Sequence, residues 1–107
     1  MRVGSSTLGK ILVDGQGRTL YMFASDTPNS GRSACNSGCI GEWPALTVAA
    51  GSTPTGGAGV PGRFGTIRRG DGSTQVTYNG LPLYFFSGDS AAGQVNGVYS
   101  GWHDVPA

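Results

Sequence analysis

Glycine and proline interrupt this chain so often that long helices have no room to form. Glycine occupies 20 of the 107 positions and proline another six, and the longest stretch free of both is residues 18–27. A typical globular helix needs about 11–12 residues, and both residue types destabilise a helix interior. The sequence therefore argues against helical bundles and α/β folds. It predicts an all-β protein of one domain, residues 1–107, because domains usually hold about 100–150 residues.

The charge content of the chain narrows the partners that it can have. Charged residues make up 12% of the sequence, with a formal net charge of +1, against a usual share of about 25%. A chain so weakly charged is a poor candidate for an electrostatic nucleic-acid binder or for an enzyme that acts on acidic substrates. A membrane-spanning helix requires about 20 mostly apolar residues, and the sequence contains no such run. We therefore expect no nucleic-acid partner and no transmembrane segment in this chain.

Turn signals between apolar runs predict β-hairpins in both halves of the chain. Asp14 and Gly15 follow the apolar run 11–13 and precede the run 19–23. Asn79 and Gly80 tolerate positive φ and lie between the expected strand 73–78 and the expected return strand 83–86. We further expect a polar lead-in at 1–8, a loop at 26–41, an extended piece at 43–48, a strand at 63–69 and a last strand at 98–105.

The two halves of the sequence repeat the same pattern. Residues 19–26 match residues 82–89, each segment contains Tyr-x-Phe-x-x-Asp, and a tryptophan follows each after a polar loop. The repeated residues are Tyr21, Phe23, Asp26 and Trp43 in the first half, and Tyr84, Phe86, Asp89 and Trp102 in the second. We predict one repeat at about 9–48, a connector at 49–62 and a second repeat at about 63–107. Together they would form a small sandwich or barrel of about six to eight short strands.

The repeated residues allow a structural and a functional interpretation. The tyrosines either pack in the core with their hydroxyls satisfied or form an exposed aromatic strip. The aspartates either accept hydrogen bonds from backbone N–H groups one to three residues further along the chain or meet as two carboxylates at the pseudo-symmetry axis. The tryptophans suit the core of each repeat. Trp43, Trp102 and His103 are also the residues that we assign to a candidate contact surface.

The two cysteines, Cys35 and Cys39, do not fit a metal or haem site. Structural zinc and iron–sulfur sites require four ligands, and the chain offers His103 as its single histidine. Covalent haem attachment requires Cys-x-x-Cys-His. A disulfide or a redox-active dithiol remains, and a small glycine-rich domain in an oxidising compartment favours the structural disulfide. A lone histidine without a nucleophile motif supports no catalytic constellation, so we expect no catalytic residue, metal or cofactor.

The doubled motif carries a family resemblance. The segments Tyr21-x-Phe23-x-x-Asp26 and Tyr84-x-Phe86-x-x-Asp89 resemble the repeated motif of a bacterial family of predicted lipoproteins and secreted repeats of unknown function. The Cys35-x3-Cys39-x3-Trp43 segment is similar to a further element of that family, and the resemblance extends over about 9–105. It implies an extracytoplasmic location and supplies no catalytic residues. His103 and Asp104 depart from the family pattern, so the resemblance assigns them no role.

These observations lead to one preferred function and two alternatives. We expect a non-enzymatic, extracytoplasmic binding module that contacts a protein or a cell-envelope component through its aromatic repeat strands and its polar loops, 27–41 and 87–97. The first alternative is a redox or electron-transfer accessory that uses the Cys35–Cys39 pair. The second is a structural subunit of an extracellular filament or assembly, and self-association is compatible with it. Residues 2–6 hold no apolar run typical of a signal peptide, so we expect the leader to be absent from this chain.

Overall fold

The computed structural model describes residues 1–7, 9–35, 38–57, 59–60, 62–99 and 101–106. It contains short strands and one five-residue helix, α1 (Gly38–Glu42). The strands are β1 (Arg2–Ser6), β2 (Gly9–Val13), β3 (Tyr21–Phe23), β4 (Thr47–Val48), β5 (Phe64–Arg68), β6 (Thr74–Tyr78), β7 (Leu81–Pro82) and β8 (Trp102–Asp104). The predicted all-β class is confirmed. Within the described residues, no helix is long and apolar enough to cross a membrane.

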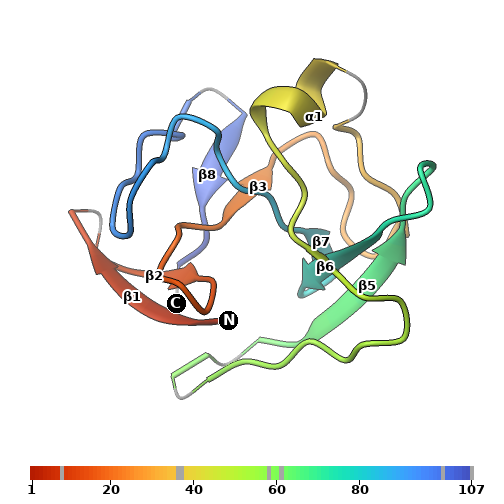
Figure 1. Cartoon of the computed structure of the whole chain (residues 1–107), viewed down its shortest axis with the longest axis horizontal. Coiled ribbons are helices and arrows are strands. Elements are labelled where there is room, and N and C mark those ends of the chain that lie inside the picture. Colours follow the sequence, from red (N-terminus) through yellow and green to blue (C-terminus); the bar gives the residue numbers. More distant parts are fainter. Residues whose placement is uncertain (8, 36–37, 58, 61, 100, 107) are drawn as a thin grey trace.

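The strands form small sheets that join the two halves of the chain (Figure 1). β1 pairs with β2, β3 pairs with β8, and a third sheet has the order β4-β6-β5 with β7 added to β6. All of these pairings are antiparallel. In the pairs β3–β8 and β4–β6, the first strand comes from the first half of the chain and the second strand from the second half. Each half therefore supplies strands that the other half completes.

The Asn79-Gly80 turn of the second half is confirmed, but the return strand is β7 (Leu81–Pro82) and not the predicted 83–86. Asn79 and Gly80 adopt φ values of 50° and 83°, and the flanking residues Tyr78 and Leu81 are paired across the turn. The turn between β5 and β6 is closed by the N–H of Arg69, which donates to the carbonyl of Ser73 at 2.9 Å. Residues that accept positive φ at low cost thus determine where the chain reverses.

The first half differs from the prediction in its strand pairing. Residues 2–6, predicted as a lead-in, form β1 and pair with β2 along its whole length, from Arg2↔Val13 to Ser6↔Gly9. The sequence of β1 shows no alternation of apolar residues. The strand stabilises the fold by completing the backbone hydrogen bonds of β2, which requires no particular side chains. The predicted hairpin between 11–13 and 19–23 remains as one bridge, Val13↔Thr19, whose two backbone hydrogen bonds run from the N–H of Leu20 to the carbonyl of Leu12 and from the N–H of Asp14 to the carbonyl of Arg18.

Two other predicted segments also change. α1 begins within the predicted loop 26–41 and ends one residue beyond it, at Glu42, and two residues of that loop, 36 and 37, lie outside the described residues. The last strand is β8 rather than the whole of 98–105, a range that includes the undescribed residue 100. Tyr99 and Trp102 exchange two backbone hydrogen bonds, so the chain turns back on itself just before β8 begins.

The buried side chains form two adjoining clusters. The first is aliphatic apart from one tyrosine, and it consists of Leu12, Leu20, Leu46, Val76, Tyr78, Leu83 and Val105. The second is aromatic apart from one cysteine, and it consists of Tyr21, Cys35, Trp43, Tyr84, Phe86 and Trp102. Both clusters draw residues from both halves of the chain. Burial of each large apolar side chain contributes roughly 1.5–3 kcal/mol, so the two halves stabilise each other.

Candidate functional site

The tyrosines of the two repeated motifs meet at the centre of the molecule. The N–H of Tyr21 donates to the carbonyl of Tyr84 at 2.8 Å, and the N–H of Tyr84 donates to the carbonyl of Tyr21 at 3.0 Å. This reciprocal antiparallel bridge joins equivalent residues of the two repeats. Both side chains are fully buried. They therefore occupy the core position and not an exposed aromatic strip.

Each tyrosine hydroxyl binds the aspartate of the other repeat. Tyr21 donates to Oδ2 of Asp89 at 2.6 Å, and Tyr84 donates to Oδ2 of Asp26 at 2.6 Å. Both aspartates are buried, with 5% and 7% of their surface exposed for Asp89 and Asp26 respectively. A buried carboxylate requires such partners, because an unsatisfied one would be costly. We name these contacts the crossed Tyr–Asp pairs.

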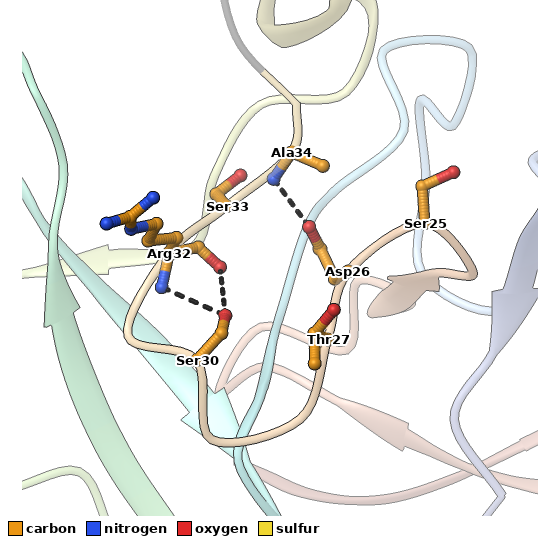
Figure 2. Close-up of a pocket in the computed structure, with 7 residues that line it drawn as sticks. All are labelled: Ser25, Asp26, Thr27, Ser30, Arg32, Ser33 and Ala34. Carbon is orange, nitrogen blue, oxygen red and sulfur yellow. Dashed lines mark hydrogen bonds between the residues drawn. The ribbon is translucent and has the colours of Figure 1, made fainter.

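The second oxygen of each aspartate closes a loop. Oδ1 of Asp26 accepts the N–H of Ala34 at 2.6 Å, as Figure 2 shows. Oδ1 of Asp89 accepts the N–H of Asn96 at 2.9 Å. We name residues 26–34 the first loop and residues 89–97 the second loop. The predicted hydrogen bonds to backbone N–H groups are thus present, but they reach eight and seven residues along the chain rather than one to three.

The tyrosine hydroxyls also contact these loops. The hydroxyl of Tyr21 accepts the N–H of Gly97 at 3.1 Å, and the hydroxyl of Tyr84 shares a hydrogen bond with Ser33 Oγ at 2.5 Å. Desolvation by burial, followed by the hydrogen bond to the partner aspartate, raises the pKa of both tyrosines well above the ordinary value. The hydroxyls consequently stay protonated donors beyond the pH at which an ordinary tyrosine ionises.

The remaining aromatic residues of the motifs form a column of four rings. The column runs Phe23, Trp102, Trp43, Phe86, with centroid separations of 4.2, 3.8 and 4.5 Å between successive rings. The two tryptophans are parallel within 1°. Tyr21 packs edge-on against Trp43, and Tyr84 packs edge-on against Trp102. The column therefore repeats the pseudo-two-fold relation of the crossed Tyr–Asp pairs.

The column corrects part of the predicted contact surface. Trp43 and Trp102 are 5% and 7% exposed, so they are core residues and cannot offer a surface to a partner. Their large rings find more burial against each other than either repeat alone could provide. His103 is exposed beside them in β8, and its role in contacts stays a prediction.

The cysteine pair forms the predicted disulfide. Cys35 and Cys39 are bonded, with Cys35 fully buried and Cys39 half-buried. Nη2 of Arg69 donates to the carbonyl of Cys35 at 2.6 Å, while Nη1 donates to Oε1 of Gln75 at 2.8 Å. The disulfide segment is therefore tied to the β5–β6 hairpin of the second repeat.

Two polar hollows lie beside the first loop. The larger, of about 460 Å³, is drawn in Figure 2 and is lined by Ser25, Asp26, Thr27, Ser30, Arg32, Ser33 and Ala34. The other, of about 170 Å³, is lined by Gly31, Arg32, Ser33, Arg68, Arg69 and Gly70. In the described part of the chain, no three His, Cys, Asp or Glu residues gather in a way that could hold a metal ion.

Comparison with known proteins identifies a family whose model matches both repeats of this chain. A family model described as a secreted repeat of unknown function matches residues 3–47 and 65–105, which together are most of the chain. This chain belongs to that family. The family name is that of a lipoprotein, and its description as secreted supports an extracytoplasmic location. No curated protein and no solved structure shows a significant match to the chain.

The sequence did not reveal which tyrosine binds which aspartate. The partners lie 68 and 58 residues apart, so no local spacing connects them. The repetition of Tyr-x-Phe-x-x-Asp was the available signal, since it indicated that whatever one motif does, the other does as well. The position of Arg32 against the β5–β6 hairpin left no such signal.

Proposed function

We propose that this protein is a non-enzymatic, extracytoplasmic binding module that contacts the cell envelope through its first and second loops. One observation carries the proposal: a backbone N–H of each loop donates to a buried carboxylate, and that carboxylate also accepts the hydroxyl of a tyrosine from the other repeat. Binding and catalytic residues are found disproportionately on loops that a rigid scaffold positions. The crossed Tyr–Asp pairs supply that scaffold.

Fastened loops reduce the cost of binding. Immobilising a flexible side chain or loop at an interface consumes free energy that would otherwise add to affinity. Here the order of both loops is established during folding, by hydrogen bonds to Ala34 and Asn96. The loops present small polar side chains to solvent, among them Thr27, Ser30 and Ser90. Such surfaces suit hydrogen-bonded recognition of a polar partner.

The repeated residues themselves support a non-enzymatic role. Tyr21, Tyr84, Asp26 and Asp89 are the groups with the most conspicuous acid–base chemistry, and they are buried and bonded to one another. A general acid or base must reach the proton that it transfers. Burial of all four residues favours a structural use of the motif.

The redox alternative and the structural-subunit alternative remain predictions. Thiol–disulfide exchange requires that an external thiolate reach one of the sulfur atoms. Cys35 is fully buried and Cys39 is half-buried, so exchange could begin at Cys39 alone, and this restricted access favours a structural disulfide over a working redox pair. We therefore rank the binding module above both alternatives.

The test is binding of the labelled protein to isolated bacterial cell envelopes, separated into a peptidoglycan fraction and a membrane fraction. Thr27→Tyr and Ala91→Tyr place a neutral, bulky side chain on the exposed part of each loop. Ser52→Tyr places the same side chain on the exposed connector and serves as the control. We expect saturable binding that at least one loop variant weakens by about tenfold or more and that the control leaves unchanged. Binding that never saturates, or that both loop variants leave intact, would overturn the proposal.

A further inference from the structure

Three arginines from two distant parts of the sequence line one hollow. Arg32 belongs to the first loop, whereas Arg68 and Arg69 lie where β5 ends and turns into β6. The fold brings the loop and the hairpin together at a space of about 170 Å³. The Arg32 side chain points away from Asp26 in Figure 2.

Two of the three positive charges around this hollow, those of Arg32 and Arg68, have no charged partner among the described residues, whereas Arg69 interacts electrostatically with Asp71. The chain has seven Lys and Arg residues, and three of them line this small space, whose lining contains no Asp or Glu. Arg32 and Arg68 are exposed, and neither forms an ion pair within the described residues. Like charges held close together repel one another. A bound anion would relieve that repulsion.

The third arginine fixes the geometry of the site. Arg69 is half-buried, and its guanidinium donates to the carbonyl of Cys35 and to the side chain of Gln75. These bonds hold the disulfide segment, which follows the first loop directly, against the hairpin. The positions of Arg32 and Arg68 relative to each other therefore follow from the fold and require no ligand to be established.

We propose that this hollow is a binding site for a phosphate group, and that its natural source is the phosphodiester of an anionic polymer of the cell envelope. Guanidinium groups match phosphate oxygens with paired hydrogen bonds. The volume is several times the roughly 30 Å³ that one water occupies, so the hollow takes one phosphate group with its bridging waters. Its open position at the surface admits a group that belongs to a long chain. This inference rests on the proposed function, because it names the ligand class for the first loop.

The experiment titrates the whole chain with three probes in low salt: inorganic phosphate, poly(glycerol phosphate) and phosphatidylglycerol vesicles. Binding is read as a dissociation constant and as chemical-shift changes of the Gly31 and Gly70 amides. Arg32→Gln and Arg68→Gln each remove one charge from the hollow. Arg63→Gln removes one charge from an exposed position outside its lining and is the matched control.

We expect poly(glycerol phosphate) to bind more tightly than inorganic phosphate, with shifts at both glycines. Each hollow variant should weaken binding by about tenfold or more, since each removes a charge-assisted contact, while the control changes it by less than about twofold. Added salt should weaken the wild-type binding more steeply than that of either hollow variant. Binding of vesicles alone, or of inorganic phosphate as tightly as the polymer, would overturn the assignment of the source.

Equal effects of Arg63→Gln and the two hollow variants would overturn the site itself, as would the absence of binding by every probe. The failure of this inference is distinguishable from the failure of the proposed function. If Thr27→Tyr abolishes envelope binding while Arg32→Gln and Arg68→Gln do not, the anion site is wrong and the loop surface stands. If the protein never binds envelopes saturably, the proposed function is wrong. The titration with poly(glycerol phosphate) then tests the anion site independently of that function.

Discussion

Replacing Tyr84 by phenylalanine removes one crossed Tyr–Asp pair together with the hydrogen bond between Tyr84 and Ser33. Tyr84→Phe removes the hydroxyl that donates to Oδ2 of Asp26 and keeps the ring that packs edge-on against Trp102 at 5.1 Å. Because Asp26 is 7% exposed, water can replace the lost donor only in part. Hydrogen bonds to charged groups contribute about 1.5–3 kcal/mol, and an unsatisfied charged acceptor costs at least as much. We expect a loss of about 2–3 kcal/mol in the free energy of unfolding.

Urea unfolding followed by tryptophan fluorescence measures this loss, because Trp43 and Trp102 are stacked in the core. With slopes typical of small proteins, the midpoint should fall by on the order of 1–2 M urea while the slope stays unchanged. Domains of ordinary stability have about 5–15 kcal/mol in total, so the variant should still fold. The cycle with Asp26→Asn and the double variant should give a coupling energy of about 1 kcal/mol or more.

Tyr99→Phe is the control, because Tyr99 is 55% exposed and its hydroxyl makes no hydrogen bond within the described residues. Its substitution should change stability by less than about 0.5 kcal/mol, as expected for surface positions. The reasoning is refuted if Tyr84→Phe costs no more than Tyr99→Phe, or if the Tyr84 and Asp26 substitutions are additive.

Three further predictions concern pH, the disulfide and a turn. Burial and the aspartate partners raise the pKa of Tyr21 and Tyr84 in the folded state. The free energy of unfolding that they contribute should therefore be complete below the unfolded pKa of about 10 and fall as pH rises beyond it. Tyr21→Phe should make that decline less steep in thermal melts at pH 8 to 11.5, and an unchanged decline would contradict the assignment. The Cys35–Cys39 disulfide closes a short loop, so its reduction should lower the free energy of unfolding by about 2 kcal/mol. Urea unfolding with and without a reductant measures this difference, and complete unfolding on reduction would contradict the prediction. Gly80 and Gly72 both have positive φ, but a Cβ at Gly80 would clash with Asn29 Oδ1, whereas the space at Gly72 is open. Gly72→Ala should cost about 1–2 kcal/mol and Gly80→Ala distinctly more, and equal losses in the free energy of unfolding would show that the contact with Asn29 is immaterial.

The local features of this fold were predictable, and the long-range ones were not. The Asn79-Gly80 turn was found because the backbone conformation of a turn depends on the residues within it. The β1 strand was missed because it adds backbone hydrogen bonds and buries no regular row of side chains. A strand of that kind leaves no periodic signal in the sequence.

The candidate site shows the same division. The repeat identified the residues that matter, from Tyr21 and Asp26 to Tyr84 and Asp89, but a pattern within each half cannot say that the partners are exchanged between halves. The stacking of Trp43 on Trp102 could not be predicted for the same reason, since each ring is covered by the tryptophan of the other repeat. Arg32 reaches the β5–β6 hairpin through the fold alone.

The central claim of this account is that the tyrosine of each motif orders the loop of the other repeat, through its hydrogen bond to the aspartate that holds that loop. Amide hydrogen exchange in Tyr21→Phe and Tyr84→Phe tests it most directly, because the substitution and the expected effect lie in different repeats. Tyr21→Phe should speed exchange at Asn96 and Gly97 in the second loop and leave Ala34 protected, whereas Tyr84→Phe should speed exchange at Ala34 and leave Asn96 protected. Faster exchange at Ala34 in Tyr21→Phe, with Asn96 unchanged, would contradict the crossed arrangement.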